Sequence, residues 1–489
     1  MMQSRVAVLI AVGLLSTGLA HASPAVKVSP KSGHPQVTIQ VDGSGFAANE
    51  AVDIYFDTTD ILLAATGGTG SFANYPIAIP AGALPGRHWI TAVGRKDGAA
   101  AQAAVTVRTN WSQSGFTAAT RYYNPWENVV SPSTVDQLSI VWSAPANAPN
   151  ASPAVAGGVV YVTGSSGNVY AISEANGAAK WTAHVCTQSF ATPAIAGGVV
   201  YVACFADGKV YALNATDGSQ KWTTPLAGHL NGSVAVAGGM AFAVSDNGDL
   251  YALDASTGAL KWTGTTGASI HTPAAAANGL VYVGSLDDSV YAFDAVAGTK
   301  VWSHATGNQI FGTPAIAFGA VYIGSADGNL YALEAHSGTI MWKFNTGVSI
   351  VGSPALALGH VYICNSNGVY SVSEGSGKLL WSSAVGLSGS CDVSVANGVV
   401  YVASPGLITA LDAAVGTTLW EAATPNPTTP PTITDGILYV PSAPSQDLLA
   451  LALNGGNDAA YRRNSAPPSP SSLHPDRRLQ PAKAFGAQK

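Results

Sequence analysis

Charged side chains are scarce in this chain, because Asp, Glu, Lys and Arg together make up 10% of its 489 residues. The net charge is −6 and the positive residues are scattered, so the sequence offers no clustered field for a phosphate backbone. We therefore expect no nucleic-acid partner. Little charge combined with 54 glycines is typical of many short strands and turns, and favours an all-β protein.

The signatures of several enzyme classes are also missing. The sequence contains no Gly-x-Ser-x-Gly elbow, no His-Glu-x-x-His zinc motif and no phosphate-binding loop. The acidic run Asp246–Asp249 lacks the further oxygen ligands of a calcium loop, and its Asn247-Gly248 pair fits a hairpin tip. From the residues alone we predict no catalytic side chain and no metal site.

The N-terminus has the pattern of a signal peptide. Arg5 precedes the apolar run Val6–Leu15, and Ala20-His21-Ala22 forms a small-x-small cleavage site. A membrane anchor is the alternative, but the apolar run is shorter than the roughly 20 residues that a bilayer requires. We predict that residues 1–22 are removed, and no cysteine follows the cut to carry a lipid. The mature chain, without an integral membrane segment, is expected to be periplasmic or secreted.

Residues 24–108 alternate apolar with polar side chains, as in Val37–Val41 and Val52–Phe56, which is the pattern of strands with one buried face. Glycine-rich turn signals separate about seven such runs, as an immunoglobulin-like β-sandwich requires. The segments Ser29–Gly33 and Gly43–Phe46 resemble bacterial Ig-like modules that precede secreted repeat domains. We interpret this region as a spacer or adhesion module without catalytic residues.

Tryptophan recurs at an almost constant spacing through most of the remaining chain. Intervals of 39, 41, 40, 40, 40, 39 and 39 residues separate Trp142, Trp181, Trp222, Trp262, Trp302, Trp342, Trp381 and Trp420. Each interval carries a Ser/Thr-Pro-Ala opening, a Val-Tyr-Val run, a tight turn, a Val/Leu-Tyr-Ala run and a glycine four residues before the tryptophan. Four strands in a period of about 40 residues are typical of one blade of a β-propeller.

The two ends of the repeat array predict how the ring closes. Seven complete repeats lie between Trp142 and Trp420, and Thr432–Leu453 begins an eighth, with Ala460 where the period requires tryptophan. Leu138–Trp142 is an outer strand without a blade, and pairing it with the C-terminal strands hides both open edges. We predict an eight-bladed propeller of four-stranded blades over residues 138–460, closed by this clasp. A degenerate eighth repeat that closes by itself is the alternative.

Two segments flank the predicted propeller. Residues 109–137, with Trp111 and Asn124–Glu127, form a lead-in whose aromatic side chains we expect to pack against the propeller rim. Residues 461–489 are rich in Pro, Ser and basic residues and cannot bury enough apolar surface to order themselves. We predict a disordered, solvated basic tail.

The motif Ala212–Trp222, repeated at Ala252–Trp262, Ala292–Trp302 and Ala332–Trp342, resembles the tryptophan-docking motif of the pyrroloquinoline quinone (PQQ) repeat superfamily. The resemblance covers residues 138 to about 460. It implies that each tryptophan wedges between neighbouring blades, so the eight tryptophans are predicted to be structural. A row of aromatic ligand-binding residues is the weaker interpretation, because a buried indole removes a large apolar area from water.

The superfamily contains two functional classes. Quinoprotein dehydrogenases hold PQQ and calcium above an eight-bladed propeller, whereas a scaffold lipoprotein of the outer-membrane β-barrel assembly machine is noncatalytic; fold alone does not choose between them. The resemblance associates dehydrogenases with long insertions between blades, an acidic base with Glu, Asn and Asp calcium ligands, and often a disulfide of adjacent cysteines. Here the spacing stays within one residue of 40 and no Cys-Cys pair occurs. We therefore expect no cofactor, with PQQ and calcium as the alternative.

The four cysteines suit a secreted chain, in which disulfides persist. Cys186 precedes an inner strand and Cys204 ends the next strand, so antiparallel pairing brings them to one face and predicts a bridge. The same registration predicts a second bridge, between Cys364 at the end of a second strand and Cys391 at the start of the following blade. A four-cysteine metal site is disfavoured because the two pairs would have to meet across the molecule.

Six polar residues lie just before the inner strands, three of them four residues before the opening and three closer to it. They are Gln188, His229 and Gln309, and Asn231, His271 and Asp392, respectively. We expect them to rim one mouth of the central channel, which is the default ligand site of a propeller. The alternative is that they satisfy loop backbone groups or face water.

Our leading hypothesis is a secreted or periplasmic, monomeric scaffold that binds an unknown protein or small-molecule ligand without catalysis. The first alternative is a PQQ- and calcium-dependent alcohol or sugar dehydrogenase, with Asp392 and His271 near the cofactor. The second alternative, a surface adhesion or carbohydrate-binding protein, is favoured only by secretion and by the modular layout.

Overall fold

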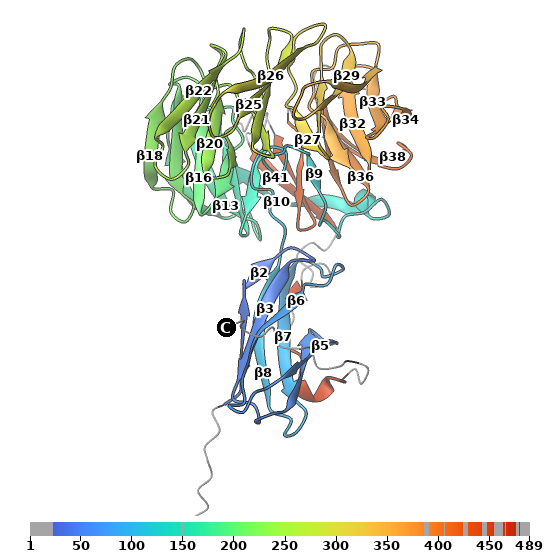
Figure 1. Cartoon of the computed structure of the whole chain (residues 1–489). Helices are drawn as coiled ribbons and strands as arrows, with labels where there is room; N and C mark the ends of the chain where they lie inside the picture. Colours follow the sequence, from blue (N-terminus) through green and yellow to red (C-terminus); the bar gives the residue numbers. More distant parts are fainter. Residues whose placement is uncertain are drawn as a thin grey trace, which may run out of the picture.

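The computed structural model describes residues 23–147, 151–385, 391–404, 406–423, 429–442, 447–453, 463–464, 466–475 and 479. The predicted signal peptide, residues 1–22, lies outside these ranges. The helices of the described residues are two short 3-10 turns, η1 (Val135–Gln137) and η2 (Pro470–Ser472), and none is long and apolar enough to cross a membrane. The chain is built from β-sheets: a ring-shaped propeller stands above a smaller N-terminal sandwich (Figure 1).

The N-terminal sandwich consists of two sheets that share one apolar core. One sheet has the order β1-β3-β6 and the other the order β2-β8-β7-β4-β5. The period-two alternation places Ile39 and Val41 from one sheet against Val52 and Ile54 from the other in this core. The immunoglobulin-like assignment stays a prediction. The strands are β1 (Ala25–Ser29), β2 (Ser32–Gly33), β3 (Thr38–Ser44), β4 (Ala51–Phe56), β5 (Thr59–Ala65), β6 (Phe72–Ala78), β7 (Gly86–Gly94) and β8 (Ala100–Val107).

Part of the C-terminal tail packs on this sandwich. The short strand β42 (Arg463–Asn464) pairs in parallel with the start of β7, at Gly86 and Arg87, which lie beyond the part of β7 that β4 covers. Gln102 Nε2 also donates to the Pro468 carbonyl at 2.7 Å, and Leu473 is buried. In its described residues the tail therefore differs from the predicted solvated segment 461–489, because an uncovered strand edge offers it hydrogen-bond partners.

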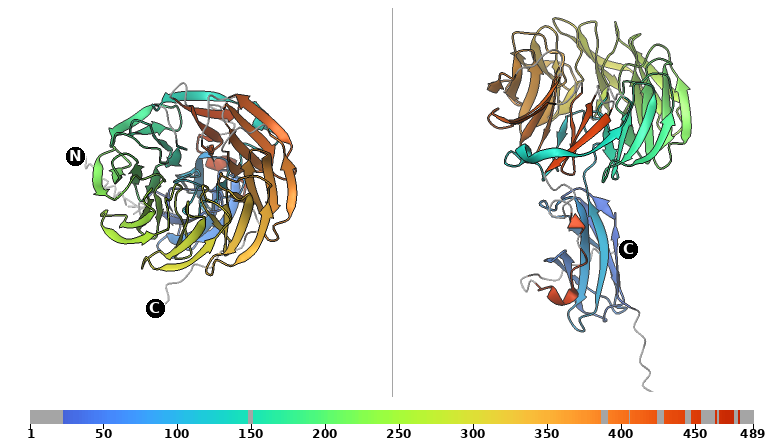
Figure 2. Two further views of the ribbon diagram at one scale, coloured as in Figure 1. Left: turned by 90° about the horizontal axis from the view of Figure 1, so that it is seen from above. Right: turned by 180° about the vertical axis from the view of Figure 1, so that it is seen from behind.

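The propeller ring contains eight sheets among the described residues, each with four antiparallel strands running from the central channel outward (Figure 2). The strands of blades 1 to 4 are β11 (Ala154–Ala156), β12 (Val159–Thr163), β13 (Asn168–Ser173), β14 (Ala179–His184); β15 (Ala194–Ala196), β16 (Val199–Cys204), β17 (Lys209–Asn214), β18 (Gln220–Pro225); β19 (Ala235–Ala237), β20 (Met240–Val244), β21 (Asp249–Asp254), β22 (Leu260–Thr265); β23 (Ala275–Ala277), β24 (Leu280–Gly284), β25 (Ser289–Asp294) and β26 (Lys300–Ala305).

Blades 5 to 7 continue the same pattern. Their strands are β27 (Ala315–Ala317), β28 (Ala320–Gly324), β29 (Asn329–Glu334), β30 (Ile340–Asn345); β31 (Ala355–Ala357), β32 (His360–Asn365), β33 (Gly368–Ser373), β34 (Leu379–Ser383); β35 (Asp392–Ala396), β36 (Val399–Ser404), β37 (Leu407–Asp412) and β38 (Thr418–Ala423). A short strand of the lead-in, β9 (Tyr123–Asn124), pairs in parallel with β35 as a fifth strand of blade 7.

Blade 8 closes the ring with strands from both ends of the repeat array. Its order is β10-β41-β40-β39, with β10 (Leu138–Pro145), β39 (Thr432–Thr434), β40 (Ile437–Ser442) and β41 (Asp447–Leu453). β10 pairs antiparallel with β41 from Leu138–Leu453 to Pro145–Asp447. The predicted clasp is confirmed, and it removes the two edges that an open array would expose. Ala460 lies outside the described residues.

The tryptophans join each blade to the next. Seven indole N–H groups donate, at 2.8–3.2 Å, to a carbonyl in the turn between the third and fourth strands of the following blade; the pairs are Trp142–Glu174, Trp181–Ala215, Trp222–Ala255, Trp262–Ala295, Trp302–Ala335, Trp342–Glu374 and Trp381–Ala413. Trp420 packs against the shared core of blades 7 and 8. The side chains therefore have the structural role that the repeat predicts, since a buried indole needs a partner for its single N–H.

Two disulfides, each joining a second strand of a blade to a loop, lie at the face of the ring away from the sandwich. Cys186 is bonded to Cys204, and Cys364 of blade 6 is bonded to Cys391 of blade 7. The second bridge therefore ties two neighbouring blades covalently.

Removing the bridge between blades 6 and 7 tests its contribution to stability. The double variant Cys364→Ala/Cys391→Ala is expected to lose about 3 kcal/mol of unfolding free energy, because the bond closes a loop of 27 residues in the unfolded chain. Urea unfolding of oxidised protein measures this loss. Under a reducing agent that opens both bridges, variant and parent should become nearly equal; a difference that persists there would assign the loss to packing instead.

Candidate functional site

Residues 109–124, which we call the channel segment, run around the inside of the propeller ring. Backbone amides at the middle of seven inner strands donate to this segment at 2.6–3.0 Å. The donor and acceptor pairs are Val155–Trp111, Ile195–Ser112, Val236–Gln113 (Oε1), Ala276–Ala118, Ile316–Ala119, Leu356–Arg121 and Val395–Tyr122. In blade 8 the direction is reversed, because Asn124 Nδ2 donates to Ile433 O at 2.9 Å. The channel segment thus bonds to all eight blades in turn.

This course gives a partner to the open edge of the inner strands, through an amide in blades 1 to 7 and through a carbonyl in blade 8. The first strand of a blade pairs with the second on one side only, so its other edge would face channel water with unpaired N–H groups. Trp111 and Phe116 fill the space beside these bonds, with ring centroids 5.3 Å apart in an edge-on contact, and Trp111 is 2% exposed. The expectation that the lead-in packs against the rim is therefore wrong for residues 109–124, which lie in the channel.

A chamber of about 180 Å³ remains in the channel beyond this segment. The residues just before the inner strands line this chamber, and each inner strand runs from there to a turn such as Gly157-Gly158, which borders the sandwich. The chamber therefore lies on the side of the ring away from the sandwich. Most of its polar lining is hydroxyl groups. Ser114 of the channel segment contributes one, and seven blades contribute one each, from Ser152, Thr192, Ser233, Thr272, Thr313, Ser353 and Thr429.

These hydroxyls form links between adjacent blades. The amide of Thr192 donates to Ser233 Oγ at 2.7 Å, and the amide of Thr313 donates to Ser353 Oγ at 3.0 Å. In blade 7 an aspartate takes the same position, so the amide of Ser353 donates to Asp392 Oδ1 at 2.9 Å. Asp392 is the only carboxylate among the described residues that line the chamber.

Two titratable groups face each other here. Burial raises the pKa of the Asp392 carboxyl above its ordinary value, against the opposing effect of the Ser353 hydrogen bonds. Burial also raises the pKa of Tyr122 on the channel segment, and the charge of Asp392 raises it further. Both shifts disfavour negative charge in the chamber.

The raised pKa predicts how Asp392 affects stability with pH. Because the folded pKa lies above the unfolded value, the folded state binds more protons than the unfolded state between the two, and stability falls as pH rises through that window. Asp392→Asn keeps an oxygen for the Ser353 amide but does not titrate. Its melting temperature should equal that of the parent near pH 4 and exceed it at pH 7. Equal melting temperatures at both pH values would contradict the assigned shift; Ser233→Ala, at the equivalent position of blade 3, serves as a non-titrating control.

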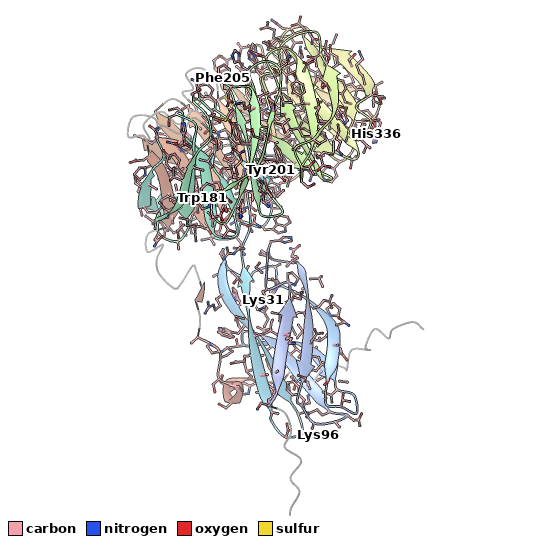
Figure 3. All side chains as sticks on the ribbon, turned by 90° about the vertical axis from the view of Figure 1, so that its left-hand side faces the viewer. Lys31, Lys96, Trp181, Tyr201, Phe205 and His336 are labelled. Carbon is pink, nitrogen blue, oxygen red and sulfur yellow. A yellow bond between two sulfur atoms is a disulfide. The ribbon has the colours of Figure 1, made fainter. Side chains whose placement is uncertain are left out.

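The structure brings two of the six predicted mouth residues, Asn231 and Asp392, into the chamber lining. Gln188, His229 and Gln309 lie in the loops outside it, where the backbone carbonyl of each accepts the amide of Phe205, Asp246 or Ala326, respectively. The ring of His229 bonds to Asp246 at 2.9 Å and stacks on Phe205, which lies on the face away from the sandwich (Figure 3). His271 is exposed and does not line the chamber.

The described residues bring together one group of potential metal donors, Cys186, Cys204 and Asp207. Both sulfurs belong to a disulfide, and only a thiolate is a metal ligand. The group therefore offers a metal one carboxylate.

A second cavity, of about 310 Å³, lies between the sandwich and blades 8 and 1, and was not predicted. Asp435 borders it, and burial, followed by the charge of Glu174, raises the pKa of Asp435 well above its usual range. Asp435 Oδ1 accepts the Thr109 amide at 2.6 Å, and Glu127 Oε2 accepts the Gly436 amide at 3.0 Å. These carboxylates anchor the lead-in to blade 8. Their sequence signals are weak, because Asp435 stands in an ordinary turn and Glu127 in an irregular segment.

A family model for the outer membrane protein assembly factor BamB matches residues 128–228, 206–371 and 365–477. No curated protein matches the chain. Similar solved structures include BamB from Moraxella catarrhalis, with 21% identity and a TM-score of 0.58 over 64% of this chain and 97% of that chain. Quinohemoprotein alcohol dehydrogenase from Comamonas testosteroni has 15% identity and a TM-score of 0.58, covering 74% of this chain and 82% of that chain. A europium-containing methanol dehydrogenase has 14% identity and a TM-score of 0.60, covering 71% of this chain and 98% of that chain. At these identities the structures share the propeller fold.

Proposed function

Because the chain belongs to the family of the outer membrane protein assembly factor BamB, we propose that it is a periplasmic or secreted scaffold that binds a partner protein without catalysis. The matched segments lie within residues 128–477, from the end of the lead-in through the propeller and into the tail. We further propose that the sandwich is an Ig-like spacer and that the protein acts as a monomer.

The channel segment is the observation that carries this proposal. It occupies the middle of the ring and bonds to each blade, so the chamber that remains measures about 180 Å³. Pockets that enclose a cofactor-sized molecule measure roughly 300 Å³ or more. A ring whose centre is filled by its own chain leaves faces and edges as the surfaces for binding, which suits a scaffold.

The dehydrogenase alternative is favoured by the likeness to alcohol and methanol dehydrogenases. The described residues of the chamber do not fit its cofactor. PQQ is a flat quinone that carries carboxylates, and such groups require cationic partners when they leave water. The described lining of the chamber contains no Arg or Lys, and its one carboxylate, Asp392, would repel the quinone. Calcium prefers six to eight oxygen ligands, including several carboxylates, and the described lining of the chamber supplies one carboxylate.

Titration with PQQ and calcium tests the proposal. Purified protein is mixed with both, binding is followed by absorbance and calorimetry, and dye-linked oxidation of alcohols is then measured. We expect neither saturable binding nor turnover, and saturable binding with turnover would establish the dehydrogenase. Deletion of the gene tests the scaffold function itself: heat-modifiable, folded outer-membrane β-barrel proteins should decrease on unheated gels. An unchanged level of folded barrels would remove an assembly role.

A further inference from the structure

Eight equivalent hairpin turns join the first and second strands of the blades. The first turn residue has a φ between 43° and 61° in every blade, and a glycine with positive φ follows it. Such two-residue turns favour Gly, Asn or Asp at the first position, because a Cβ crowds the backbone at positive φ. In blades 1 to 8 this position holds Gly157, Gly197, Gly238, Asn278, Phe318, Leu358, Asn397 and Asp435.

Blades 5 and 6 break this rule with large apolar side chains. Phe318 and Leu358 take left-handed conformations, with φ of 45° and 58°, that such residues rarely adopt. Both side chains also lie in solvent, where Phe318 is 86% exposed and Leu358 is 60% exposed. Neither the local backbone nor the core explains their presence. Residues held in unfavourable conformations point to function when they are also exposed.

The two tips lie on the ring face that carries the sandwich, but outside the area covered by the sandwich and lead-in. The covered tips belong to blades 7, 8 and 1, where Gly398, Gly436 and Gly158 approach Pro132, Val129 and Arg108, respectively. A Cβ added to Gly319 or Gly359, which follow Phe318 and Leu358, would meet nothing within 4 Å. Two apolar tips from adjacent blades therefore stand side by side on an open part of this face.

Arg121 of the channel segment adds a positive charge to this pair. Its guanidinium lies 5.9 Å from the centre of the Phe318 ring, and its Nε donates to the Ile316 carbonyl at 2.9 Å, which fixes its position. Arg121 is exposed and forms no ion pair with a carboxylate among the described residues, and the one carboxyl whose pKa its charge lowers, Glu374, is buried, so the exposed guanidinium faces no acidic group at the surface. Apolar side chains beside an available guanidinium complement a segment that is both apolar and acidic.

We propose that Phe318, Leu358 and Arg121 form the docking site for an apolar, acidic segment of a partner protein. This inference rests on the proposed scaffold function and names the surface that would carry it. The sandwich projects from the same face (Figure 1), so a flat bilayer or another bulky body meets the sandwich before it reaches the tips. A slender segment that lies across the two hairpins avoids that obstacle.

Two fluorescein-labelled peptides of ten residues test the site by fluorescence anisotropy, one alternating leucine with glutamate and the other alternating leucine with lysine. The full chain should bind the first peptide saturably and the second much more weakly. Phe318→Asn/Leu358→Asn should weaken binding about 30-fold, as for interface hot spots, and Arg121→Gln should weaken it less. The double variant adopts the residue of Asn278 and Asn397, so its melting temperature should rise while its binding falls. Val415→Asn, at a position 60% exposed in a blade 7 turn, is the matched control and should bind like the parent.

Several outcomes would overturn the proposal. They are no saturable binding of the leucine–glutamate peptide, equal binding of both peptides, or an unchanged affinity in the double variant. Binding of the full chain to anionic vesicles, or self-association in sedimentation, that the double variant abolishes would assign the tips to lipid or to a second copy instead. If the scaffold function is wrong but the docking site is right, the protein should show turnover with PQQ and should still bind the leucine–glutamate peptide.

Discussion

Replacing Trp111 by alanine is expected to lower the free energy of unfolding by about 3–5 kcal/mol, as for other buried aromatic side chains cut back to Ala. Trp111 is buried in a core that contains residues of blades 1, 6, 7 and 8, including Val155, Tyr362 and Tyr439. Its backbone exchanges two hydrogen bonds with Val155, at 2.7 and 2.9 Å. The substitution therefore removes contacts that hold the channel segment against blades 1 and 8, where the two ends of the repeat array meet. Urea unfolding followed by circular dichroism measures the loss.

Two further variants limit the interpretation of this result. Trp111→Phe keeps most of the apolar burial and the edge-on partner Phe116, so it should lose clearly less than the alanine variant. Val296→Ala changes a side chain that is 83% exposed and should stay within about 0.5 kcal/mol of the parent. A loss in Trp111→Ala as small as that of Val296→Ala would show that the indole is not buried in the channel.

Gly298→Ala should destabilise the protein by about 2–5 kcal/mol through the joint between blades 3 and 4. Gly298 has a φ of +73°, and a Cβ there would lie 2.6 Å from Trp262, whose indole bonds to the neighbouring Ala295 carbonyl. The methyl group thus combines a left-handed backbone cost of about 1–2 kcal/mol with overpacking of about 1–3 kcal/mol. Thermal and urea unfolding measure the combined effect.

Gly279→Ala separates these two contributions. Gly279 has a similar φ of +80°, but an added Cβ meets nothing within 4 Å. This control should lose only the backbone cost, about 1–2 kcal/mol. If Gly298→Ala and Gly279→Ala lose the same free energy, the tryptophan does not lie against the following blade as described.

The repeat was visible in the sequence because its cause is local and periodic. Each tryptophan meets the next blade 32 to 34 residues later, so the same spacing recurs along the chain and also predicts the clasp between β10 and β41. The channel segment has no such period. Most of its bonds to the inner strands join backbone groups, which any residue supplies, and its partners lie as far as 326 residues away, as between the Thr109 amide and the Asp435 carboxylate.

Sequence spacing also predicts only part of the residues at the channel mouth. An offset of four residues before an inner strand places Gln188, His229 and Gln309 in loops, where their carbonyls cap neighbouring turns. Asn231 and Asp392 stand nearer the opening and reach the chamber. The distinction depends on how each loop folds over the preceding blade, which sequence spacing does not specify. Phe318 and Leu358, in contrast, stand out in the aligned repeats, because the same turn position holds Gly, Asn or Asp in the other six blades.

Amide hydrogen exchange of the inner strands tests most directly whether the channel segment fills the ring. With residue-resolved mass spectrometry, the amides of Val155, Ile195, Val236, Ala276, Ile316, Leu356 and Val395 should exchange as slowly as those of the second strands, because each bonds to the segment. Exchange of these seven amides within seconds, while the second strands remain protected, would mean that water reaches the inner edges and would contradict the account.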